Sequence, residues 1–503
     1  MAQEYVAIKV DNTSDTATKQ QANTGHDQPL GGTGSNVQDD VPLSPTEKNF
    51  LEEIKPERAG GTSSSKKQKS QHTKIQQVPE MLRREHFNKY FQPRAIAIGP
   101  LHHNSKTMFD EDIKKKLAAE FVKKMEHDKS PEESNQAKSS KEGDQAESLY
   151  RIIKKNIEHL KTYFDEKVIK SYNDESLAIM LFSDGCSIMQ FIYSCARGDL
   201  KLFNINNGQA ALIQQDLFLL ENQIPYKVLK LLMKNSSSHK PEDLEESIKA
   251  FIRMNVMSPA KYSENIELDL GTETKEPVHL LDLLRSALLQ EDNSDHHQIY
   301  GHHHNHHLKK DFSKCQVEYK RTFRNIQDLK AAGIKVEPSD TCSLRDVSFS
   351  ALCFAGYLKL PPLIVDDSTG RKLLNLVAYE MCPDKFQTED GVTSYVYFLD
   401  SLIDNEEDAK DLRMATIFRN RLSSDAEVAK MFNEIGTDLV PVPGYVDVKI
   451  KIQKHYDNRC MTWVAQVYRD HFSSPWTILA LTAAVIVLVL TGVQTWFAVL
   501  PRG

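Results

Sequence analysis

The chain has 503 residues, of which 40% are hydrophobic and 26% are charged, so it can bury one large core or two ordinary ones. Its net charge of −7 is spread along the sequence, which excludes the basic surface that nucleic-acid binding requires. Seven cysteines without a CxxC pair indicate neither a disulfide framework nor a cysteine zinc cluster.

Residues 1–75 predict a disordered N-terminal extension. They are rich in Ser, Thr, Gln, Asn, Gly and Asp and show almost no apolar periodicity. No basic start followed by an apolar run is visible, so a secretory signal peptide is not expected. A KKQK cluster at 66–69 could act as a targeting tag, although a solvated linker is the commoner explanation.

A folded domain is expected from 76 to 472. Near its start, YFQPRAIAIGPLHH at 90–103 contains two prolines and a glycine, which exclude a helix there and favour a short strand or extended segment. Residues 129–148 are polar and of low complexity, and they predict a surface loop.

Helical patterns dominate the rest of this domain. An amphipathic stripe covers 149–164, and the segment 177–196 is apolar on most sides, which predicts a central core helix. Pro225 is expected to open a helix, since proline suits a first turn. Shorter amphipathic helices are predicted at 279–289 and at 425–435, the second capped by Asp425.

Strand character appears at 346–368, where apolar and polar residues alternate and prolines should confine the pieces to sheet edges. The predicted fold class is therefore mainly α, or α+β with a small β element. It consists of one large helical domain and a C-terminal transmembrane helix.

That transmembrane helix is predicted at 477–500. No charged residue occurs between Ser473 and Pro501. The 23 residues of 478–500 would span about 34 Å as a helix, against a hydrocarbon core of about 30 Å. Trp476 and Trp496 lie near its two ends, where indole rings prefer the interface. A buried core helix is the weaker explanation, because such helices rarely run this long without a polar face.

The charge flanking this helix predicts its orientation. The preceding segment carries five basic residues: Lys449, Lys451, Lys454, Arg459 and Arg469. The positive-inside rule puts that side in the cytosol, so we expect a tail-anchored protein of the plasma membrane or endomembranes. The sequons at Asn12 and Asn235 would then stay without sugar. A GPI anchor would need a signal peptide, which is not visible.

A histidine-rich tract is the first place where chemistry is conceivable. HHQIYGHHHNHH holds seven histidines between His296 and His307, within a polar insertion at 290–310. Imidazole binds zinc, copper and nickel well, whereas structural sites need fixed spacing and usually a cysteine or carboxylate. A biased surface insertion is the commoner explanation.

Four other residues are candidates for chemistry. Cys186 could be a nucleophile if a histidine lay nearby in space, and Asp184 could be a catalytic or a buried carboxylate. Glu221 and Asn222 precede Pro225, where capping of a helix junction explains them. Because no known catalytic motif accompanies these residues, the sequence assigns no catalytic, cofactor-binding or metal-binding residue and no cofactor.

Several of these segments together resemble the plant family called domain of unknown function 247. The resemblance rests on YFQPRAIAIGPLHH, MLFSDGCSIMQFIY and DLFLLENQIPYKVLKLL, followed in order by HLLDLLR, AAGIKV, LKLPPLIVDDST, LLNLVAYE, SYVYFLDSLID and a final SPW before an apolar tail. It covers roughly residues 75–500. Leu101 and Ser187 depart from the family's blocks, where an aromatic and a bulky apolar residue are usual.

The resemblance implies a plant membrane protein of unknown biochemistry, and three hypotheses follow. The first is a recognition or signalling component with the bilayer and other proteins as partners and no nucleic acid; one version makes it a pollen determinant of self-incompatibility. The second is a membrane-bound hydrolase using Cys186 or Asp184, although an enzyme is the less favoured class. The third is a metal-binding histidine loop. The sequence does not indicate the oligomeric state.

Overall fold

The structure is a computed structural model that describes residues 74–83, 87–103, 105–109, 111–123, 138–271, 276–290, 325–352, 355–383, 391–437, 439, 444–457 and 475–499. Nearly all of the predicted N-terminal extension, the residues 129–137 and the histidine tract lie outside the described residues. Predictions about those segments stay predictions.

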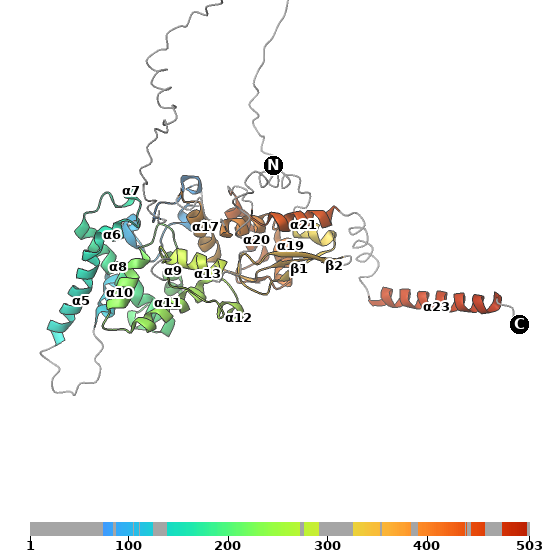
Figure 1. Ribbon diagram of the computed structural model, residues 1–503, viewed down its shortest axis with the longest axis horizontal. Helices are drawn as coiled ribbons and strands as arrows, with labels where there is room; N and C mark the ends of the chain where they lie inside the picture. Colours follow the sequence, from blue (N-terminus) through green and yellow to red (C-terminus); the bar gives the residue numbers. More distant parts are fainter. Residues whose placement is uncertain are drawn as a thin grey trace, which may run out of the picture. The chain divides into compact units, whose positions relative to one another are not determined.

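The described part of the chain is mainly helical, as predicted (Figure 1). The helices before the first strand are η1 (Glu80–Leu82), α2 (Phe87–Tyr90), α3 (Gly99–His102), α4 (Glu111–Val122), α5 (Lys138–Lys155), α6 (Ile157–Lys161), α7 (Glu166–Ile169), α8 (Asp174–Arg197), η3 (Leu200–Phe203), α9 (Asn207–Asp216), α10 (Tyr226–Asn235), α11 (Pro241–Asn255), α12 (Ala260–Ser263), α13 (Leu280–Leu289) and α16 (Ile326–Ala331). The later elements are β1 (Ile334–Pro338), β2 (Ser348–Leu352), β3 (Ala355–Leu360), β4 (Leu363–Val365), α17 (Thr369–Glu380), α18 (Gly391–Asp400), α19 (Glu406–Met414), β5 (Phe418–Asn420), α20 (Asp425–Gly436), α21 (Val446–Tyr456) and α23 (Pro475–Val499).

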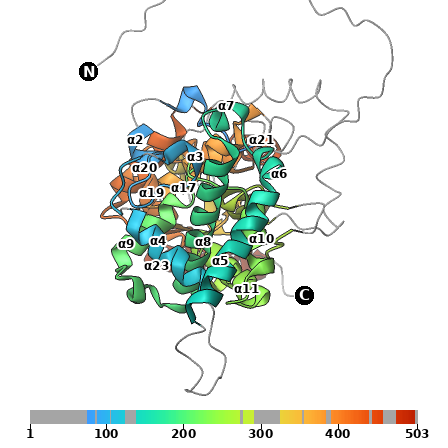
Figure 2. The same ribbon diagram turned by 90° about the vertical axis from the view of Figure 1, so that its left-hand side faces the viewer.

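Helix α8 is the centre of the helical core, which confirms the prediction for 177–196. It begins after Asn173, whose side chain accepts a hydrogen bond from the backbone N–H of Ser176, and it ends at Gly198 in the left-handed conformation. Its apolar side chains pack against α4, α5, α10 and α11 (Figure 2). Since partners surround it, α8 can be apolar on most sides without exposing that surface to water.

The small β element consists of two sheets. In the first, β3 lies between β1, which runs parallel to it, and β2, which runs antiparallel; in the second, β4 pairs in parallel with β5. The prediction that prolines confine these strands to edges is wrong for β3, which is central. Pro361 and Pro362 follow its last residue, so they end the strand without removing a hydrogen bond from the ladder.

Two predictions about helices at particular segments are wrong. Residues 91–98 form no helix, as expected, but they form no strand either. Gly99–His102 form the short helix α3 with Pro100 in its first turn, where the missing N–H costs nothing. The expected loop at 129–148 is helical from Lys138 onward, where α5 begins before the amphipathic stripe that starts at Leu149.

The predicted cap of α20 is also wrong. The hydroxyl of Ser424 caps this helix by accepting from the backbone N–H of Glu427. Asp425 instead lies in the first turn, where its carboxylate binds Arg413 and Asn420 and its negative charge suits the helix dipole. Pro225, in contrast, does open α10 as expected.

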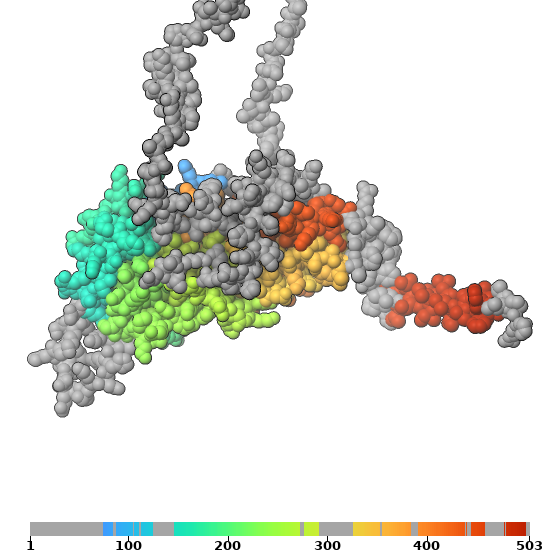
Figure 3. All heavy atoms as spheres, in the orientation of Figure 1, coloured from blue at the N-terminus to red at the C-terminus, as the bar shows by residue number. Residues whose placement is uncertain are grey.

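Two helices in the described chain are long and apolar enough to cross a membrane, judged by length and composition alone: α8 and α23. They differ in burial, because 72% of the apolar window of α8 is buried inside the domain and 0% of that of α23. The described side chains of α23 are exposed along the whole helix (Figure 3). Helix α23 is therefore the candidate membrane span.

Candidate functional site

Two of the residues selected from the sequence, Asp184 and Asn222, bind the backbone of 91–98 or of Gly99 just after it, and 91–98 is a segment without helix or strand. Ala95, Ile96 and Ile98 are buried, so their peptide groups can reach neither water nor a regular ladder. Buried backbone donors and acceptors need partners, since each unpaired one costs roughly 1–3 kcal/mol. Side chains from α4, α8, α17 and the turn after α9 supply these partners, and we call this set of contacts the polar network.

Asp184 of α8 provides the first link of the polar network. Its Oδ1 lies 2.6 Å from Nζ of Lys114 on α4, and its Oδ2 accepts from the backbone N–H of Gly99 at 2.9 Å. The ammonium group of Lys114 also donates to the carbonyl of Ala97 at 3.1 Å. All of these groups are buried, so the ion pair fixes the end of the irregular segment against α8 and α4.

Asp216, the last residue of α9, binds the start of the same segment. Its Oδ2 accepts from the backbone N–H groups of Arg94, Ala95 and Ile96 at 2.9, 2.5 and 3.1 Å. Its Oδ1 lies 3.2 Å from the guanidinium of Arg371 on α17. Burial raises the pKa of the Asp216 carboxyl, while these donors favour its charged form.

Asn222 connects the two ends of the polar network. Its Oδ1 accepts from the N–H of Ile98 at 2.7 Å, and its Nδ2 donates to the carbonyls of Ile96 and Asp216 at 3.1 and 2.9 Å. Because three of its hydrogen-bonding positions are thus used by backbone, Asn222 serves a distant segment. The predicted capping of the helix junction is found at its first helix, since the amide donates to the carbonyl of Asp216 at the end of α9, but not at the second, since the N-cap of α10 is Pro225 with no side-chain cap.

Glu221 joins the first described residues of the domain to α3. Its Oε1 accepts from the backbone N–H of Val78 at 2.8 Å and pairs with the guanidinium of Arg83. Its Oε2 lies 3.6 Å from Nε2 of His102, whose Nδ1 contacts the hydroxyl of Ser105 at 3.2 Å. Burial raises the pKa of the Glu221 carboxyl, and this carboxylate joins two segments that each lie 119 or more positions from it.

The ionisation of His102 predicts a pH dependence of stability. Burial, assisted by the nearby cation of Arg83, lowers the pKa of His102 to about 4, against an ordinary value of 6.5. Between pH 6.5 and pH 4, His102 therefore binds a proton in the unfolded chain but not in the folded domain. The stability that the neutral histidine contributes is lost as the pH falls through this window. We expect a loss of roughly 3 kcal/mol over that window.

Chemical unfolding of the full chain in detergent micelles, measured from pH 7 to pH 4, tests this expectation. Glu221, with its raised pKa, acts with the opposite sign, so the contribution of His102 is read from the difference between wild type and His102→Asn. Between pH 7 and pH 4, the free energy of unfolding should fall less in His102→Asn than in the wild type. Parallel profiles would show that His102 titrates alike in both states.

Cys186 does not meet the requirements of a nucleophile. Its side chain is fully buried in α8, and burial raises the pKa of its thiol far above the ordinary value. A buried neutral thiol behaves as a small apolar group, since the thiolate is the reactive form. Among the described residues, no group of three or more His, Cys, Asp or Glu side chains is placed to hold a metal ion.

The sequence patterns did not identify several charged residues that are buried in the structure. Glu380 of α17 accepts from the guanidinium of Arg285 at 2.7 Å and from the backbone N–H groups of Val392 and Thr393 at 3.1 and 2.7 Å, which ties α13 and α18 to α17. Lys114, Asp216 and Arg371 were likewise missed. Lys114 and Arg371 have a charged neighbour and Asp216 follows two glutamines, so no local pattern marks these side chains as buried.

The fold and the polar network define a mainly helical domain, stabilised by buried polar side chains, whose chain also carries a candidate membrane span. The chain belongs to a plant protein family of unknown function, because the model of that family matches residues 75–490. The resemblance noted in the sequence is thus confirmed, and with it the plant class of this protein.

Two curated relatives come from Arabidopsis thaliana. UPF0481 protein At3g47200 is 26% identical over 437 residues, covering 82% of this chain and 83% of the relative. Putative UPF0481 protein At3g02645 is 29% identical over 188 residues, covering 37% of this chain and 34% of the relative. The match to the second relative thus spans about a third of that protein's length. No solved structure matches the chain.

Proposed function

We propose that this protein is anchored in a membrane by α23, holds its helical domain in the cytosol and acts as a recognition or signalling component that binds other proteins. The observation that carries the anchor is the contrast between α8 and α23. Both are apolar enough to span a bilayer, yet the domain covers only α8. An uncovered helix of this length is unfavourable in water, whereas a lipid bilayer satisfies its apolar side chains.

Two features support the cytosolic side for the domain. Exposed lysines at positions 451 and 454 of α21 precede α23 in the sequence. By the positive-inside rule, basic residues beside a span favour the cytosolic side of the membrane. In addition, the described cysteines at 186, 195, 342 and 382 form no disulfide bonds, as is usual in a reducing compartment.

Binding is favoured over catalysis because the polar residues of the family-like motifs make contacts inside the domain. Asp184, Glu221 and Asn222 bind buried backbone groups of the domain itself, and the thiol of Cys186 is buried and neutral. The alternative function, a membrane-bound hydrolase using Cys186 or Asp184, would need at least one of these groups to face a substrate.

The anchor is tested by placing charges in the middle of α23. Replacing both Val487 and Leu490 by Arg opposes insertion by roughly 5–7 kcal/mol, so the full chain should shift from the membrane pellet to the supernatant after a carbonate wash. Replacing the same two residues by Ala is the matched control and should leave the chain in the pellet. Equal partition of both variants would contradict the anchor.

The orientation and the partner are tested separately. Protease added to intact vesicles should digest the helical domain, and Asn235 should carry no sugar; a glycan at Asn235 would place the domain in the lumen.

Affinity capture from membranes, with and without residues 290–310, should show a partner that depends on this insertion. For the pollen version of the hypothesis, the insertions at 129–148 and 290–310 should differ between alleles, and invariant insertions would contradict it.

A further inference from the structure

We propose that α23 pairs in the bilayer with α23 of a second copy of this chain, through the helix face that carries Gln494. This inference rests on the proposed membrane anchor. Residues spaced alternately by three and four positions lie on one face of a helix and form the seam of a left-handed helix pair. In α23 that spacing connects Ala484, Val487, Thr491, Gln494 and Ala498.

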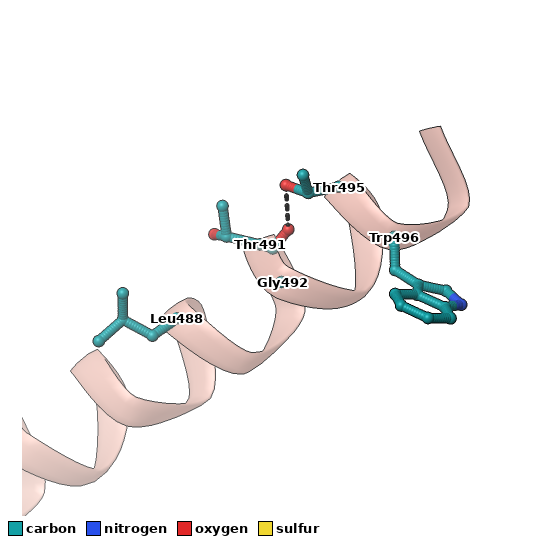
Figure 4. Close-up of a pocket in the computed structure, with 5 residues that line it drawn as sticks. All are labelled: Leu488, Thr491, Gly492, Thr495 and Trp496. Atoms are coloured by element: carbon teal, nitrogen blue, oxygen red, sulfur yellow. Dashed lines mark hydrogen bonds between the residues drawn. The ribbon is translucent and has the colours of Figure 1, made fainter. Parts of the chain in front are cut away.

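A shallow groove lies along one side of this seam. It is lined by Leu488, Thr491, Gly492, Thr495 and Trp496, and Figure 4 shows Leu488, Thr491 and Thr495 on one side of the helix, with the indole ring turned away. A Cβ added to Gly492 would meet no atom within 4 Å. Small residues beside the seam let two helix backbones approach closely, which is how helices pack in lipid.

Gln494 differs from the other polar side chains of α23 in its hydrogen bonding. The hydroxyls of Thr482, Thr491 and Thr495 each donate to a carbonyl of their own helix, at 2.9, 2.7 and 2.8 Å. The amide of Gln494, in contrast, makes no hydrogen bond within the described part of the chain. In hydrocarbon a partner from another helix stabilises such an amide, since a hydrogen bond between membrane helices contributes about 0.6–2 kcal/mol.

A second copy of α23 supplies that partner. Every copy crosses the bilayer in the same direction, so a parallel symmetric pair brings both Gln494 residues to the same depth. A primary amide has donors and an acceptor, and two of them can therefore bond to each other across the two-fold axis. Lipid tails offer neither group.

The test uses the full chain, labelled with a donor or an acceptor fluorophore and reconstituted in lipid vesicles. Energy transfer between copies gives the dimer dissociation constant in the membrane. Gln494→Leu should raise that constant roughly 3-fold to 30-fold, since hydrogen bonds between membrane helices contribute about 0.6–2 kcal/mol. Thr491→Ile, which adds bulk on the same face, should also raise it. Thr482→Val, on the opposite face, is the control and should have no effect.

Three outcomes would overturn this inference. Absence of energy transfer in the wild type would show that copies do not pair, and equal transfer in the wild type and Gln494→Leu would show that they pair elsewhere. Failure of the wild-type chain to remain in vesicles after a carbonate wash would overturn the membrane anchor itself and the pairing with it. The carbonate wash thus distinguishes failure of the anchor from failure of the pairing.

Discussion

Gly99→Ala is expected to destabilise the domain by about 2–5 kcal/mol. Gly99 has a φ of +69°, where an L-residue with a Cβ is disfavoured by roughly 1–2 kcal/mol. The added Cβ would also lie 2.4 Å from the carbonyl oxygen of Gln223, and such overpacking costs typically 1–3 kcal/mol. Equilibrium unfolding by urea of the full chain in detergent micelles measures the sum.

Gly198→Ala is the matched control for this prediction. Gly198 ends α8 with a φ of +78°, but a Cβ there would meet no atom within 4 Å. Its substitution therefore carries only the conformational cost, about 1–2 kcal/mol. If both variants lost the same free energy of unfolding, the close approach of Gly99 to Gln223 would contribute nothing, and the described geometry of this turn would be wrong.

Asp184→Ala is expected to lower the free energy of unfolding by roughly 3–5 kcal/mol, because it leaves the ammonium of Lys114 buried without its carboxylate. The backbone N–H of Gly99 also loses its acceptor. Lys114→Met alone should have a similar cost, since the buried carboxylate of Asp184 then loses the ammonium group of Lys114. The variant with both Asp184→Ala and Lys114→Met should lose less than the sum of the two single losses, because neither charge of the pair is left buried.

The same variants separate a structural role for Asp184 from a catalytic one. The network predicts a double-mutant coupling of about 1–3 kcal/mol in unfolding experiments, and it predicts that Cys186→Ala, which removes only a buried neutral sulfur, is much milder. Additive losses would show that Lys114 and Asp184 do not interact. An Asp184→Asn chain that kept its stability but lost a defined activity would instead favour the hydrolase.

Local patterns predicted the elements whose character depends on their own residues. Helix α8 was predicted because its apolar side chains are continuous, and Pro225 was predicted to open α10 because proline fits only a first turn. Positions at which two similar residues compete were less predictable: Ser424 rather than Asp425 caps α20, since both have suitable oxygens and adjacent places. Burial of a polar side chain was not predictable at Lys114, where three lysines follow one another.

The sequence by itself predicted that this chain is mainly helical, resembles a plant family and contains one buried apolar helix at 177–196 and one transmembrane helix at 477–500. Hydropathy measures only the preference of a segment to leave water, and lipid or a protein core satisfies that preference equally well. The sequence predicted a buried helix at 177–196 and a span at 477–500, and the tertiary structure shows which of the two the domain covers: it packs around α8 and leaves the described side chains of α23 uncovered. It also showed the buried polar residues to be partners of an irregular backbone, since hydrogen bonds between Asp216 and Arg94, about 120 positions apart, leave no trace in local spacing.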